Sequence, residues 1–151
     1  MILVIDIGNT NITCGIYQEE ILIKTFRLTS DRAKTKDAFI DELESNTVDY
    51  KITECIIGSV VDELNNSLKQ ACDEVFGIQS YLFDTTSKTG IILDVEKPET
   101  VGADRIANTF AVYKKYKTCY NINVFIEVSV IVWKIQKFMI QKNFKMSMYL
   151  Q

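Results

Sequence analysis

Hydrophobic and polar residues alternate along the start of the chain in three strand-length segments, residues 2–7, 11–18 and 20–29. In the second segment Ile12, Cys14 and Ile16 share one side of the chain, while small or polar residues occupy the other. A period of two with one apolar side is typical of a strand that buries one face. Polar turns separate the segments, so the pattern predicts a three-stranded antiparallel meander.

The pattern then changes to helical spacing. Thr35 precedes a helix that is expected to bury Phe39, Ile40 and Leu43 and to end between residues 46 and 51. Residues 55–61 form a nearly continuous apolar run, which is typical of a central strand covered on both faces.

A second helix is predicted over residues 62–76, with Gly77 at the position of a C-terminal glycine cap, and a short strand follows over 80–83. The order β-β-β-α-β-α-β predicts an α/β fold with a mixed sheet and helices against its faces. Residues 106–116 complete the pattern as a third helix, with an apolar stripe behind an entry turn at Pro98.

Composition narrows the class of protein. A chain of 151 residues with 47% hydrophobic residues can bury one core, so we expect a single domain or a domain with a short appendage. The net charge of −3 argues against a nucleic-acid partner. Four separated cysteines and the lack of histidine argue against a zinc site or a histidine base.

The first segment contains no secretion signal, because Asp6 interrupts the apolar run after five residues. We therefore expect a cytoplasmic protein with reduced thiols and without a membrane partner.

The first candidate for chemistry is the turn that follows the first strand, Asp6-Ile7-Gly8-Asn9-Thr10-Asn11. It places a carboxylate, a hydroxyl and backbone N–H groups around one small volume, a combination that suits a phosphate carrying a divalent cation. The structural alternative is a β-hairpin in which Gly and Asn supply positive φ.

The second candidate is Asp104-Arg105, in the first turn of the helix after residue 102. A carboxylate at a helix N-terminus is stabilised by the helix dipole and tends to stay ionised, which suits a proton acceptor. Arg105 could hold a carboxylate or phosphate beside it. The structural alternative is a capping Asp next to a surface Arg.

Together the two motifs resemble the type III pantothenate kinases. Asp-Ile-Gly-Asn-Thr-Asn at the start and Pro-Glu-Thr-Val-Gly-Ala-Asp-Arg-Ile-Ala-Asn at 98–108 carry the resemblance, which spans residues 1–116. Segments 29–35, 58–61 and 88–90 are similar to the same family. It belongs to the actin/Hsp70/sugar-kinase superfamily, so the resemblance implies the N-terminal half of an actin-like, ribonuclease H-like ATPase fold.

The resemblance also implies roles for individual residues. The substrate contacts would be Gly102, Ala103, Asp104, Arg105 and Val95, with Asp104 as the proton acceptor for the pantothenate hydroxyl. ATP phosphates would lie against Asp6, Ile7, Gly8, Asn9, Thr10, Asn11, Ile12 and Thr13. The family uses ATP with Mg²⁺ and a monovalent cation, K⁺ or NH₄⁺, and forms homodimers.

Two departures from the family pattern are visible. Val95 stands where many members have a tyrosine, and Lys97-Pro98 replaces an Asn-Pro pair. After Tyr116 the expected Asp-Phe-Gly-Thr-Ala-like turn is missing, and with it the cation-binding Asp and a second phosphate-binding turn.

Charge changes at the same point, since residues 1–116 sum to −7 (12 basic, 19 acidic) and residues 117–151 to +4 (five basic, one acidic). Our hypothesis is that residues 117–151 are a frame-shifted or otherwise disrupted start of a second half. The alternative is a genuine appendage, with a strand over 128–133 and an amphipathic helix that lies on a membrane or a partner. A non-catalytic fragment or ligand-binding half-domain therefore stays open beside the kinase.

Overall fold

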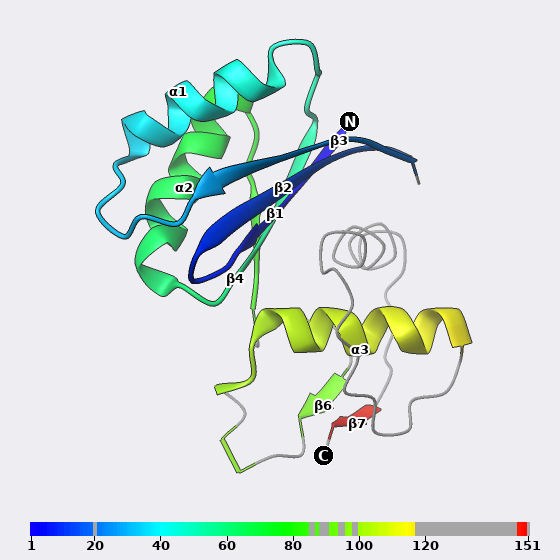
Figure 1. Cartoon of the computed structure of the whole chain (residues 1–151). Coiled ribbons are helices and arrows are strands. Elements are labelled where there is room, and N and C mark those ends of the chain that lie inside the picture. The colour runs from blue at the N-terminus through cyan, green and yellow to red at the C-terminus, as the bar shows by residue number, and fades with distance from the viewer. Residues whose placement is uncertain are drawn as a thin grey trace.

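A five-stranded mixed sheet with helices packed against it forms the main body of the chain (Figure 1). The computed structural model describes residues 1–19, 21–84, 87, 91–93, 96–97, 100–116 and 148–150. The elements are β1 (Ile2–Ile7), β2 (Asn11–Gln18), β3 (Ile21–Thr29), α1 (Lys36–Thr47), β4 (Glu54–Ser59), α2 (Asp62–Phe76), β5 (Tyr81–Phe83), β6 (Ile91–Leu93), α3 (Ala103–Tyr116) and β7 (Met148–Leu150).

The strand order is β3-β2-β1-β4-β5. The first three strands pair antiparallel, which confirms the predicted meander. β4 runs parallel to both of its neighbours, β1 and β5, and so occupies the interior position expected of its apolar sequence. The carboxyl ends of β1 and β4 therefore lie side by side at one edge of the sheet.

One face of the sheet carries the main core. α1 and α2 lie together on this face (Figure 1). Burial of each large apolar side chain contributes about 1.5–3 kcal/mol, so this layer dominates the stability of the domain. Its principal members, all buried, are Leu3, Ile5, Ile7, Ile12, Cys14, Ile16, Phe39, Leu43, Ile57, Leu64 and Leu68.

α3 lies apart from α1 and α2 and crosses beneath the carboxyl ends of β1 and β4 (Figure 1). Ala103, Ile106 and Ala107 are buried, so the first turns of the helix are anchored by their apolar side. Asp104 and Arg105 fall in the first turn, as the sequence predicted.

The structure departs from the sequence-based expectations in a few places. β4 ends at Ser59 rather than at residue 61, because the Ser59 hydroxyl accepts a hydrogen bond from the Val61 amide at 2.9 Å and turns the chain into α2. The short strands β6 and β7 were not expected; they pair in parallel. Residues 20, 85–86, 88–90, 94–95, 98–99, 117–147 and 151 lie outside the described residues, as do the predictions made for them.

Among the helices that the structure describes, none is long and apolar enough to span a membrane.

Candidate active site

A tight turn over residues 8–11 connects β1 to β2, and Asn11 is also the first residue of β2. Ile7 and Ile12 form the last strand pair, and the Gly8 amide donates to the Asn11 carbonyl at 3.0 Å. A Cβ on Gly8 would lie only 3.1 Å from that carbonyl oxygen, so glycine allows the turn to close this tightly. The remaining polar residues of the turn, Asn9 and Thr10, are exposed and open to a ligand.

The hairpin alternative is correct in topology but wrong in its backbone conformation. The turn does join two antiparallel strands, yet in the described part of the chain positive φ occurs at Glu19 and Gly77 and not at Gly8 or Asn9. Four-residue connections are commonly built around a type I turn, which needs no positive φ. The Gly8 amide is one of the backbone N–H groups that were expected to face a phosphate, but it donates its hydrogen bond within the turn.

Asp6 lies one residue before the end of β1, on the sheet face opposite Ile5 and Ile7. Its strand neighbours are Thr13 on β2 and Gly58 on β4. It is half-buried, at the carboxyl end of two parallel strands, the edge at which α/β sheets most often bind ligands.

Asp104 approaches Asp6 from α3. The carbonyl of Gly102 accepts hydrogen bonds from the amides of Arg105 and Ile106, at 3.1 and 3.4 Å, which starts the helix. Asp104 is half-buried in this first turn. The two carboxylates, 98 positions apart in the chain, are thus brought into one electrostatic site.

The pKa of Asp6 reflects this arrangement. Burial, and secondarily the negative charge of Asp104, raise the pKa of Asp6 from its ordinary value of 3.8 to about 6. A carboxylate with a raised pKa at a strand end, such as Asp6, is typical of a site that acquires positive charge when its ligand binds.

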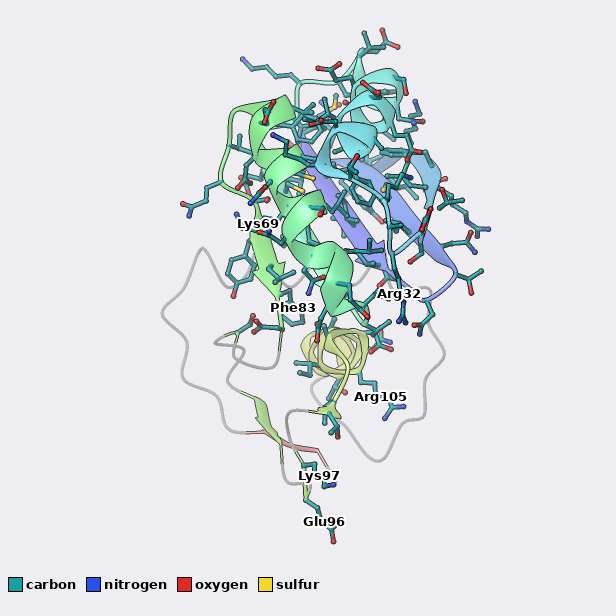
Figure 2. The ribbon with its side chains drawn as sticks, turned by 90° about the vertical axis from the view of Figure 1, so that its left-hand side faces the viewer. Arg32, Lys69, Phe83, Glu96, Lys97 and Arg105 are labelled. Carbon is teal, nitrogen blue, oxygen red and sulfur yellow. The ribbon has the colours of Figure 1, made fainter. Side chains whose placement is uncertain are left out.

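The other predicted site residues differ in their exposure. Ile7 and Ile12 are fully buried in the core, so only their backbone groups can meet a ligand. Arg105 is exposed and points away from the strands (Figure 2), as the surface alternative expected. Val95 lies outside the described residues.

The sequence motifs did not assign a role to Gly58 or Val60. Gly58 lies beside Asp6 in the strand register, and Val60 contacts the start of α3 at Gly102. The signal for Gly58 was a glycine inside an otherwise apolar strand, which often marks close approach of another group.

The three described cysteines, Cys14, Cys55 and Cys72, are free and buried in the core. Burial, and for Cys55 first a hydrogen bond with Cys72, raises the pKa of the Cys14 and Cys55 thiols well above the ordinary value. They therefore act as small apolar core residues. Within the described residues no cluster of three or more His, Cys, Asp or Glu side chains is placed to hold a metal ion.

The mixed sheet, the turn after β1 and the carboxylate at the start of α3 define an α/β domain consistent with the N-terminal part of an actin-like ATPase-fold kinase. The sequence model of the family described as type III pantothenate kinase matches residues 2–125. The chain belongs to the type III pantothenate kinase family.

Individual relatives agree with this assignment. The type III pantothenate kinase of Finegoldia magna is 40% identical over 123 residues, which cover 78% of this chain and 47% of the relative. That of Citrifermentans bemidjiense is 39% identical, with 48% of its length covered, and that of Listeria monocytogenes serotype 4a is 37% identical, also with 48% covered. The chain spans about half the length of the curated relatives it matches.

Proposed function

We propose that the chain provides the catalytic half of a kinase that transfers the γ-phosphoryl group of ATP to pantothenate. The product is 4'-phosphopantothenate, and the reaction is the first step of coenzyme A biosynthesis. Membership of the family supports the reaction. The observation that carries it is the approach of Asp104 on α3 to Asp6 at the end of β1.

Phosphoryl transfer asks the protein mainly to align the attacking and leaving oxygens and to neutralise charge. In the proposed mechanism Asp104 accepts the proton of the pantothenate primary hydroxyl as that oxygen attacks. The exposed Asn9 and Thr10 hold phosphate oxygens, and Gly102 to Arg105 form the substrate side.

The donors present suit a nucleotide that carries Mg²⁺, because the turn offers a hydroxyl and amides while Asp6 provides negative charge close by. When bound, the metal would neutralise the charge of the phosphates. Asp6 would lie near the metal-bound phosphates, where the positive charge of the Mg²⁺ would offset the cost of burying its charged form.

The requirement for K⁺ or NH₄⁺ and the homodimer are proposed from the family resemblance alone, and the cytoplasmic location from the interrupted apolar run of the first segment. The carboxylate expected to bind the monovalent cation has no counterpart in residues 117–151. The family match extends to residue 125, nine positions beyond Tyr116. We retain the proposal that the chain from about residue 117 onward is a frame-shifted or otherwise disrupted start of a second half. Sequencing of the gene from the Arg105 codon onward tests it, since another frame should then encode an Asp-x-Gly-Thr turn.

A second candidate is a non-catalytic half-domain that binds ligand without turnover. The missing second phosphate-binding turn after Tyr116 favours it. The two candidates differ in one observable, the appearance of phosphorylated product.

The test is phosphorylation of radiolabelled pantothenate by the wild-type chain and by Asp104→Asn. We expect the substitution to lower the rate by about 100-fold or more, as loss of a general base does. Asp62→Asn removes a carboxylate from the first turn of α2 and serves as the matched control. Equal rates for wild type and Asp104→Asn would exclude the proposed base, and preference for sugars or acetate would indicate another phosphotransferase.

A further inference from the structure

Gly102 immediately precedes α3, in a position where a side chain would ordinarily be useful. Residues that start a helix are usually Ser, Thr, Asp or Asn, whose side chains cap the free amides. The φ angle of Gly102 is not positive, so a left-handed backbone is not the reason for glycine at this position. The reason for glycine here must therefore lie in the surrounding space.

That space is occupied by the carboxylate of Asp104. A Cβ placed on Gly102 would overlap the Asp104 Oδ1 atom and lie 3.5 Å from the Asp104 Cγ. It would also lie 3.5 Å from the Val60 Cγ1, an ordinary van der Waals contact, at the corner between β4 and α2. The helix start therefore cannot move toward Val60 without compressing that contact, and the Asp104 side chain is the group that must yield.

We propose that Gly102 is a positioning residue: its missing side chain leaves the space in which the Asp104 carboxylate lies, and so fixes where that carboxylate lies at the start of α3. This role rests on the proposed function of Asp104 as the proton acceptor. The consequence is a steric restriction at position 102, where a Cβ would displace the base and would meet it before any residue of the phosphate turn at 8–11.

Displacement of the base should affect turnover more than nucleotide binding. A general base must lie within hydrogen-bond reach of the proton that it removes, and small misplacements of reacting groups are costly. The turn that would bind ATP is held by its own hydrogen bond, from the Gly8 amide to the Asn11 carbonyl. The nearest neighbours of a Cβ on Gly102 would be Asp104 and Val60, not residues of this turn.

The direct test is the χ1 angle of Asp104, measured by NMR from three-bond couplings to its carboxyl carbon in wild type and Gly102→Ala. We expect one rotamer in the wild type and a loss of about half or more of its population in the variant. Gly102→Ser carries the same Cβ and adds a hydroxyl favoured at helix starts, so it provides a more stable second variant. An unchanged χ1 in both variants would overturn the proposal.

Steady-state kinetics of the variants provide a second measurement. In Gly102→Ala we expect kcat to fall about tenfold or more while KM for ATP stays within about twofold. Gly77→Ala is the control for stability, because it strains a positive φ at the far end of α2 and leaves Asp104 in place. An equal fall of kcat in Gly77→Ala would show that loss of stability, not positioning, causes the effect, and would overturn the role.

A double variant, Val60→Ala with Gly102→Ala, removes the Val60 γ carbons, so that the start of α3 has room to shift and the new methyl group can clear the Asp104 carboxylate. We expect it to recover the wild-type rotamer and most of kcat. A kcat that stays low although the rotamer returns would overturn the link between the position of Asp104 and turnover. If the wild-type chain forms no phosphopantothenate, the proposed function fails, and the χ1 measurement still decides whether Gly102 places Asp104.

Discussion

At the scale of one residue, the charge of Asp6 lowers the stability of the fold, although the same charge suits a binding site. It is the charged member of a strand whose other side chains, Leu3 to Ile7 in alternation, build the core. Its ionised form is disfavoured by burial and by the charge of Asp104, so the folded chain holds a proton on Asp6 more tightly than the unfolded chain does. Such a residue is expected in a binding site, where a ligand provides the missing positive charge.

The effect of Asp6 on stability follows from this difference. Because the pKa of Asp6 is about 6 in the folded chain and near 3.8 in the unfolded chain, its contribution is most favourable below pH 4 and is lost as pH rises through 6. Asp6→Asn should raise the free energy of unfolding at pH 7 by about 1–3 kcal/mol and by much less at pH 4. Urea unfolding of both proteins at the two pH values measures this. A gain of equal size at both would show that Asp6 titrates normally.

At the scale of elements, helix ends were the best predicted features and short strands the least. Gly77 adopts the left-handed conformation (φ 63°) foreseen for a C-terminal cap, and its amide donates to the Asp73 carbonyl. The Asp73 carboxylate in turn accepts hydrogen bonds from the Ser80 amide at 2.6 Å and from Lys69 at 2.6 Å. Burial would raise the pKa of Asp73, but these hydrogen bonds outweigh it and lower the pKa. The glycine could be predicted from the sequence. The hydrogen bond between Ser80 and Asp73 could not, because it joins residues across a loop.

Gly77→Ala tests the cap. A Cβ at positive φ costs about 1 kcal/mol, and nothing within 4 Å would add a clash, so the loss of stability should be close to that backbone cost. Thermal unfolding of the variant should show it, with the exposed neighbour Gln79→Ala as the control. A loss no greater than that of the control would mean that this turn does not need glycine.

Lys24 on β3 provides the positive charge that the last turn of α1 lacks. Its Nζ donates to the Asn46 carbonyl at 2.7 Å and lies 5.8 and 5.4 Å from the ring centres of Phe26 and Tyr50. Lys24→Met keeps the apolar stem and should lower the free energy of unfolding by about 1 kcal/mol. Arg27→Met, on an exposed position of the same strand, should be neutral in the same denaturant series. If both variants unfold alike, the contacts of Lys24 add nothing.

At the scale of the molecule, periodicity predicted the meander, the interior β4 and the two helices, because each of these elements has a complete apolar side. It did not predict that both helices pack on one face of the sheet. The end of β4 and the pairing of β6 with β7 were not predictable. A continuous apolar run does not show where a strand stops, and three-residue strands such as Ile91–Leu93 are too short to show a period. The approach of α3 to β1 was implied by family resemblance, and no local pattern in the residues encodes it.

The whole chain also exposes apolar surface. Ile21, Leu22 and Ile23 are 67%, 41% and 41% exposed on β3, an edge strand of the sheet. An exposed apolar edge strand can pair with another chain, so we expect concentration-dependent self-association. Sedimentation velocity should show it, and Ile21→Lys with Ile23→Lys should reduce it. Val48→Lys changes an exposed but isolated residue and should have no effect. A monodisperse wild-type monomer at high concentration would contradict this expectation.

The central claim is that Asp6 and Asp104 form one site. The most direct measurement is the pH titration of the Asp6 carboxyl carbon by NMR in the wild-type chain and in Asp104→Asn. The account predicts a midpoint near 6 in the wild type, as burial and Asp104 together raise the pKa of Asp6, and a lower midpoint in the variant. A midpoint that Asp104→Asn leaves unchanged would contradict the account, because the two motifs would then not meet.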